Sequence, residues 1–237
     1  MNDRKQRLTD VYTEHHKQHR RYGFSYRVGE RGQQFAAWVG TDKRVLDLGC
    51  RDGALTQCYA VGNSVTGVDI DQQALSLAKE RLGISTLWLD LNREPLPFDD
   101  SSFDVAVAGE VLEHLEDPAF VVGQAHRVLA PDGIFIGSVP NSFHWRARVA
   151  FLTGHHIEDP THLHLFSRSK LLKLLERFDH VELVCVGGIG GRMLPIVPTW
   201  LSQAVVRSLP TLFANDFLFR GAKADIPPED TPSGVGS

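Results

Sequence analysis

Short apolar runs alternate with helical patterns along most of this chain, and this alternation limits the fold more than any other feature. Seven runs are typical of strands, at residues 45–48, 65–70, 86–91, 103–108, 133–139, 181–186 and 216–220. Helix start signals lie between several of them, such as Asp117 before Pro118, and Ser167 before RSKLLKLLERF. This order is typical of βαβ units around a parallel sheet. We therefore predict an α/β fold, a Rossmann-like doubly wound sheet of seven strands in a single domain.

The chain divides into a main domain and flanking segments. We expect an N-terminal helical cap over residues 1–40, an α/β domain over 41–225 and a disordered tail over 226–237, which is rich in proline and glycine. Residues 141–166 and 187–215 do not fit the alternation. Because additional segments after strands commonly build substrate sites in α/β folds, we expect these two to be substrate-specific insertions.

Composition excludes several classes of function. A net charge of -4 argues against a nucleic-acid-binding protein, which would present a basic surface. The three cysteines lack metal-site spacing, so we expect a reducing, cytoplasmic location. No stretch approaches the ~20 apolar residues of a membrane span. Leu201, Val205, Leu209 and Phe213 form an apolar stripe at helical spacing, which indicates either core packing or contact with a membrane surface. The oligomeric state is not fixed by the sequence.

The segment VLDLGCRDG predicts a strand that ends in a ligand-binding turn. A dinucleotide-binding turn needs a glycine where this chain has Arg51, because the backbone must approach a pyrophosphate there. Arg51 therefore argues against NAD and FAD. Asp47, Gly49 and Gly53 keep a D-x-G-x-x-x-G spacing, and Asp69 follows at the separation at which a carboxylate reaches a ribose diol. An adenosine-type ligand without a pyrophosphate fits this pattern.

Five segments in order resemble the motifs of class I S-adenosylmethionine-dependent methyltransferases. VLDLGCRDG resembles the first motif and VTGVDI the second; LDLNREPLPFDDSSFDVAVAGEVLEHLEDP resembles the third and fourth, and HRVLAPDGIFIGSVPN the segment that follows. The resemblance covers residues 45–141, and THLHLFSRSKLLKLLE more loosely. It implies a mostly parallel sheet whose last strand is antiparallel, with S-adenosyl-L-methionine as the cofactor and methyl transfer as the reaction.

The resemblance also implies a set of cofactor-binding residues. Residues at the first turn would line the methionine end of the cofactor, the second strand would end at its ribose, and the third and fourth motifs would reach its adenine and its methyl group. In that order they are Asp47, Gly49, Cys50 and Gly53, then Asp69 and Ile70, then Asp90 and Leu91, and finally Glu110. Arg51 replaces the family's middle glycine, and we expect its side chain to point into solvent.

The acceptor is predicted from the resemblance alone. Residues 140–154 and 161–176 resemble the corresponding stretch of methyltransferases of glycan and antibiotic pathways, and more distantly of quinone-pathway O-methyltransferases. This resemblance implies a small-molecule or saccharide hydroxyl as the acceptor. His162, His164 and His114 are candidates for a catalytic base. A metal site that uses Glu158 or Asp159, and a purely structural role for these histidines, are the alternatives. We predict no metal, because the spacing matches no standard site.

Two further interpretations concern the whole protein and its N-terminus. A non-catalytic binding module of the same fold remains open because no base is clearly defined, while a nicotinamide oxidoreductase is disfavoured by Arg51. His15, His16 and His19 belong to a polar N-terminal helix, and we expect them to face solvent. The aromatic residues of RRYGFSYR, which are Tyr22, Phe24 and Tyr26, are candidates for a flap over the cofactor.

Overall fold

All seven expected strands lie in one sheet. The computed structural model describes residues 2–19, 21–155, 161–187 and 199–224. The strand order is β3-β2-β1-β4-β5-β7-β6. Only β7 runs antiparallel to its neighbours, β5 and β6. The strands are β1 (Arg44–Leu48), β2 (Ser64–Asp69), β3 (Ser85–Trp88), β4 (Phe103–Gly109), β5 (Leu129–Pro140), β6 (Asp179–Gly187) and β7 (Ala214–Ala222). The predicted Rossmann-like, mostly parallel sheet with an antiparallel last strand is confirmed.

Helices cover both faces of the sheet, and each face has its own apolar core. On one face α2 (Val28–Val39), η1 (Thr56–Cys58) and α3 (Gln72–Leu82) pack through residues such as Phe35 and Ala78. On the other face α4 (Pro118–Val128) and α6 (Arg168–Leu174) pack through residues such as Val122 and Leu171. The predicted caps are present, since Asp117 and Ser167 accept hydrogen bonds from backbone N–H groups of the first turns of α4 and α6.

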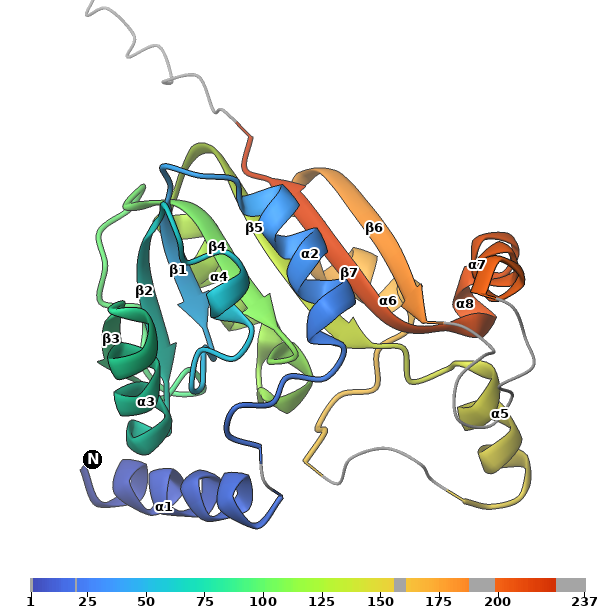
Figure 1. The fold of residues 1–237 in the computed structure, drawn as a ribbon, viewed down its shortest axis with the longest axis horizontal. Coiled ribbons are helices and arrows are strands. Elements are labelled where there is room, and N and C mark those ends of the chain that lie inside the picture. Colours follow the sequence, from blue (N-terminus) through green and yellow to red (C-terminus); the bar gives the residue numbers. More distant parts are fainter. Residues whose placement is uncertain (1, 20, 156–160, 188–198, 225–237) are drawn as a thin grey trace, which may run out of the picture.

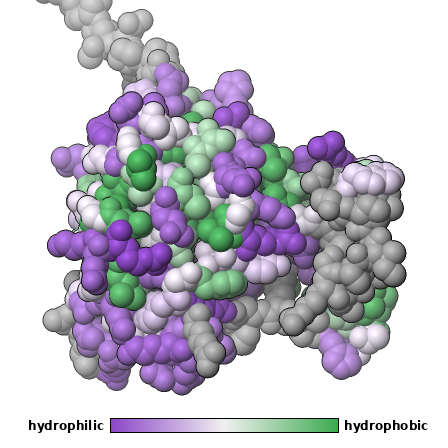
Figure 2. All heavy atoms as spheres, viewed as in Figure 1, coloured by the Kyte–Doolittle hydropathy of each residue, from purple (hydrophilic) through white to green (hydrophobic). Residues whose placement is uncertain are grey.

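The remaining helices lie outside these two layers. α1 (Asn2–Gln18) crosses beyond the carboxyl ends of β1 and β2, and α5 (Trp145–Leu152), α7 (Thr199–Ser208) and α8 (Pro210–Phe213) lie near the opposite edge of the sheet (Figure 1). η2 (Leu112–His114) follows β4 directly. Figure 2 shows hydrophobic residues over α5, where Val149, Phe151 and Leu152 are exposed. No helix in the described ranges is long and apolar enough to cross a membrane.

Several sequence-based expectations differ from the structure in their details. Residues 130–133, APDG, carry the proline and glycine that are typical of a turn, yet they lie inside β5, which begins at Leu129. The pairing with β4 shifts there, and Asp132 has a φ of 59°. β3 ends at Trp88 rather than at residue 91. In the apolar stripe Phe213 packs against the core, whereas Leu209 is exposed. The predicted tail falls outside the described residues, and the domain boundaries remain predictions.

Candidate active site

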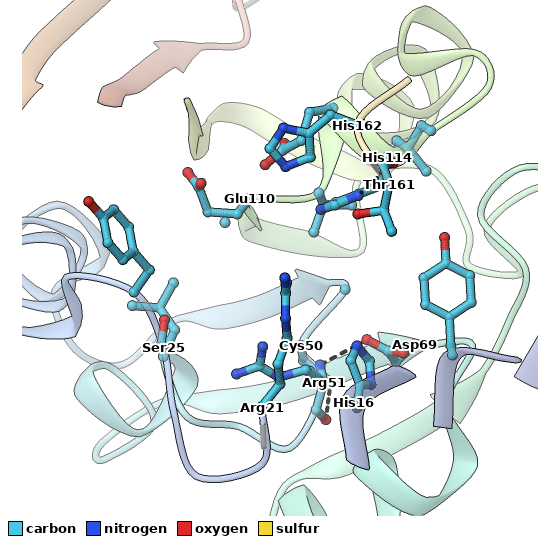
Figure 3. Close-up of a pocket in the computed structure, with 18 of the residues that line it drawn as sticks. His16, Arg21, Ser25, Cys50, Arg51, Asp69, Glu110, His114, Thr161 and His162 are labelled. Carbon is cyan, nitrogen blue, oxygen red and sulfur yellow. Dashed lines mark hydrogen bonds between the residues drawn. The ribbon is translucent and has the colours of Figure 1, made fainter. Parts of the chain in front are cut away.

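A pocket of about 720 Å³ opens at the carboxyl ends of the central strands. This is within the range of about 300–1,000 Å³ that is typical of small-molecule sites. Asp69 and Arg51 lie on one wall, and Glu110, His114 and His162 lie on the wall opposite (Figure 3). Because parallel strands end at one edge of a sheet, the ends of β1, β2, β4 and β5 all contribute to this pocket.

The turn after β1 is held tightly against its neighbours. The N–H groups of Gly49 and Cys50 both donate to the carbonyl of Val68, at 2.7 and 3.2 Å. Gly49 has a φ of 71°, and a Cβ at this position would lie 2.3 Å from Val111. Gly49 and Cys50 line the pocket, and their role in binding a cofactor stays a prediction. Gly53 does not line the pocket. Its φ of 75° favours glycine, and a Cβ there would lie 2.5 Å from the end of the Leu82 side chain.

Arg51 does not point into solvent as expected. Its guanidinium donates to the carbonyl oxygen of Phe24, and its Nε donates to Asp52 Oδ1 at 3.3 Å. These contacts tie the first turn to the segment between α1 and α2. Its backbone has a φ of 48°, a left-handed conformation that costs a non-glycine residue roughly 1–2 kcal/mol. The Arg51 side chain thus forms part of the pocket wall.

The end of β2 provides well-defined polar contacts on the wall that carries Asp69 and Arg51. Asp69 is 8% exposed, and its two oxygens accept hydrogen bonds from the backbone N–H groups of Arg51 and Asp71, at 2.9 and 2.8 Å. Burial is the main reason that the pKa of Asp69 is raised, and these two backbone bonds oppose the rise. A carboxylate fixed in this way retains lone pairs for a diol. Ile70, Asp90 and Leu91 also line the pocket.

Asp47 lies elsewhere than the resemblance implied. Its carboxylate points away from the pocket lining and accepts hydrogen bonds from the hydroxyl groups of Thr56 (2.6 Å) and Tyr59 (2.8 Å). Burial raises its pKa to about 6, against the lowering effect of these two bonds. The placement of Asp47 at the methionine end of the cofactor is therefore not supported, and its contacts are those of a core residue that anchors η1 to β1.

The N-terminal helix covers the pocket rather than facing solvent. One carboxylate, that of Asp71 at the start of α3, accepts hydrogen bonds from Thr13 (2.8 Å), His16 (2.8 Å) and Tyr22 (2.7 Å). Burial alone would raise the pKa of Asp71, but the bonds from His16, Tyr22 and Thr13 lower it to about 2. The expected solvent exposure was wrong for His16, which is buried because it is bound to Asp71.

The residues around this bond network match expectation in part, since His19 is exposed as expected. His15 and His19 line the pocket next to His16. In the segment that follows α1, Phe24 and Tyr26 line the pocket as expected of a flap, whereas Tyr22 bonds to Asp71. No local pattern indicated the role of Asp71, which looks like an ordinary helix cap.

The wall opposite Asp69 is acidic and buried. Glu110 has a φ of 60°, and its Oε1, together with both carboxylate oxygens of Glu113 and Oδ2 of Asp216, has no hydrogen-bond partner among the described residues. Burial first, and then the charge of Glu110, raise the pKa of Glu113 well above its usual range and that of Asp216 to about 7. Glu110 was predicted, but Glu113 and Asp216 were missed.

Arg31 is a second residue that the sequence did not single out. It lies on α2, is 2% exposed and lines the pocket beside Gly109. Nη1 donates to the carbonyl oxygen of Tyr26 at 2.9 Å, and Nε has no hydrogen-bond partner in the described part of the chain. A buried guanidinium that lines the pocket is suited to a carboxylate of a ligand.

The candidate histidines separate into two groups. His114 and His162 line the pocket with their ring centroids 4.9 Å apart. His164 lies outside the lining, where its Nε2 is 3.3 Å from the carbonyl oxygen of Glu116. We therefore remove His164 from the candidate catalytic residues. Glu158 and Asp159 lie outside the described residues. Glu113, His114 and His162 each place a potential metal-ligand atom within 4.8 Å of the others.

Comparisons with known proteins identify the family. A sequence model of the methyltransferase domain matches residues 16–181, more than half of the chain. The chain belongs to this family. This family belongs to the S-adenosylmethionine-dependent class I methyltransferases, so the resemblance predicted from the sequence is confirmed. A SAM-dependent methyltransferase from Archaeoglobus fulgidus shares the fold, with a TM-score of 0.61 over 83% of this chain and 93% of that chain, at 19% identity.

Two curated proteins with similar sequences are both named as O-methyltransferases. The chain is 34% identical to a ubiquinone biosynthesis O-methyltransferase of Pseudomonas aeruginosa over 41% of this chain and 44% of that protein. It is 27% identical to the protein of the same name from Pasteurella multocida over 70% of this chain and 76% of that protein. The chain thus spans less than half the length of the first of these relatives.

Proposed function

We propose that this methyltransferase-family chain transfers the methyl group of S-adenosylmethionine to a hydroxyl group of a small molecule or saccharide. The arrangement of one pocket carries the proposal: Asp69 at the end of β2 faces Glu110, His114 and His162 across it. The names of the two O-methyltransferase relatives support oxygen as the acceptor atom. The unpaired cysteines at residues 50, 58 and 185 support a reducing, cytoplasmic location.

One wall of the pocket would bind the methyl donor, and the opposite wall would bind the acceptor. Asp69 would accept hydrogen bonds from the ribose hydroxyls, and Ile70 and Leu91 would pack on the adenine. Arg31 would hold the carboxylate of the methionine end. The acceptor hydroxyl would then lie against Glu110 and the two histidines, in line with the methyl–sulfur bond. Because the sulfonium is already activated, alignment is the main contribution of the protein, worth up to roughly 7–11 kcal/mol.

Calorimetry with Asp69→Ala tests the donor site. Loss of two charge-assisted hydrogen bonds, at about 1.5–3 kcal/mol each, predicts that donor affinity falls by about 100-fold or more while the unfolding transition persists. Unchanged affinity would refute the ribose assignment. A methyl-transfer screen against sugars, quinols and phenols, read by mass shift, tests the reaction. Donor binding without transfer to any acceptor would favour the non-catalytic binding module.

A further inference from the structure

The local fold brings Glu113, His114 and His162 together. Glu113 and His114 lie on η2, directly after β4. The N–H groups of Leu163 and His164 both donate to the backbone carbonyl of Glu113, at 2.8 and 3.1 Å, and so dock the segment that carries His162 onto η2. Two residues 48 positions apart in the sequence, His114 and His162, are thereby held next to each other.

A backbone contact also sets the orientation of one imidazole. Nδ1 of His114 lies 3.1 Å from the carbonyl oxygen of Thr161. A carbonyl only accepts, so Nδ1 carries the proton and the lone pair of the neutral ring is on Nε2. Histidines that bind metals are commonly oriented by a bond of this kind from the other ring nitrogen to a backbone carbonyl.

The carboxylate of this group lacks the partners that a buried charge requires. Glu113 is fully buried, and neither of its oxygens has a hydrogen-bond partner among the residues that the structure describes. A buried carboxylate without a partner costs several kcal/mol. Glu110 and Asp216 line the same pocket, and Arg31 and Arg27 lie beside them, the latter 3.7 Å from Asp216, so the three carboxyl groups outnumber these two cations. A cation therefore complements this wall, and imidazole lone pairs beside it favour a metal ion over an ammonium group.

We propose that Glu113, His114 and His162, with Glu110 beside them, bind a divalent first-row metal ion at the acceptor end of the pocket. Their ligand atoms lie within 4.8 Å of one another. Opposite ligands of one ion are about 4.2 Å apart, so small side-chain rotations would close the site. Mixed imidazole and carboxylate ligands suit Mn²⁺, Fe²⁺ or Zn²⁺ better than Ca²⁺. The sequence-based prediction of no metal site is replaced by this proposal.

The ion would activate the acceptor, and this part of the inference rests on the proposed function. A bound divalent ion lowers the pKa of a hydroxyl that coordinates it. The acceptor O–H bond breaks and its proton passes to Glu110 and then to water. The methyl–sulfur bond breaks as the oxygen–methyl bond forms, which leaves a methyl ether and neutral S-adenosylhomocysteine. Metal binding itself requires neither the methyl donor nor the acceptor.

Mn²⁺ binding to the chelator-treated full chain tests the proposal. The electron paramagnetic resonance signal of free Mn²⁺ should fall on titration with protein, with one ion bound per chain. His114→Gln and His162→Gln should each weaken binding by about 100-fold, since ligand loss exceeds the effect of an orienting partner. His164→Gln, two residues from His162 and outside the pocket, is the matched control and should bind as the wild type does.

Three outcomes of these titrations decide whether the pocket binds a metal ion at these residues. Loss of Mn²⁺ binding in both pocket variants but not in the control, with the circular dichroism of all three unchanged, supports the site. Wild-type protein that binds neither Mn²⁺ nor Zn²⁺ at millimolar concentration overturns it, as does equal binding by all variants. Calorimetry with S-adenosylmethionine on the same metal-free samples separates the two proposals, because donor binding without metal binding refutes only the metal site.

Discussion

Asp47→Asn distinguishes a core role for this residue from a role in cofactor binding. In the folded protein burial raises the pKa of Asp47 from 3.8 to about 6. Asparagine keeps one carbonyl-type oxygen, which can still accept the bonds from Thr56 and Tyr59, and it removes the buried charge. The substitution therefore changes how stability depends on pH while leaving the local hydrogen bonds in place.

The magnitude follows from the two pKa values. Because the folded-state pKa lies above the unfolded value, the stability that Asp47 contributes is fully present below about pH 4 and is lost as the pH rises through 6. A rise from 3.8 to about 6 corresponds to about 3 kcal/mol of unfolding free energy across this window. The variant should lack this part of the pH dependence.

Urea unfolding of both proteins at several pH values between 4 and 8 measures the effect. The difference in unfolding free energy between variant and wild type should grow in favour of the variant as the pH rises. If the difference stays constant, the buried charge of Asp47 does not carry the effect. Donor affinity should change by less than about tenfold, because Asp47 does not line the pocket. A larger loss would restore the assignment that the family resemblance implied.

Two further predictions concern residues that the structure brought into the site. Asp71→Asn should loosen α1, because the hydrogen bonds from Thr13, His16 and Tyr22 lose a charged acceptor. Limited proteolysis within residues 2–18 and release of the methyl donor should both become faster. Unchanged rates would show that α1 is held by its other contacts. Arg31→Met keeps an unbranched stem but removes the guanidinium, and it should weaken donor binding by about 10–100-fold in calorimetry because a bond to a carboxylate is lost. An unchanged affinity would place that carboxylate elsewhere.

The central strands could be predicted because they are short apolar runs that are buried on both faces, such as residues 45–48 and 103–108. Asp69 and Glu110 could be placed for a related reason: they follow parallel strands directly, and such strands end at a common edge. Boundaries were less predictable where a bulge replaces a turn. The APDG segment carries turn signals, yet the pairing of β5 with β4 continues past it.

Other residues of the site could not be predicted, because long-range packing places them. Asp216 reaches the pocket only because β7 inserts between β5 and β6, where it pairs with Pro140. His16 lies on a polar helix that looked like a solvated surface, and it is buried by its contact with Asp71, 55 positions away. Local patterns contain no information about such contacts.

The two ends of the pocket are consequently built in different ways. Most of the donor wall comes from residues 49–91, whose turns and strand ends fix one another through backbone hydrogen bonds, and Arg31 from α2 completes it. The acceptor wall combines η2, the segment around His162 and β7, which meet only in the folded chain. Substitutions near residues 161–166 or 214–216 can therefore change the acceptor while leaving the contacts of Asp69 intact. Acceptor preference is the property that we expect to vary most readily on this scaffold, because no part of the donor wall depends on it.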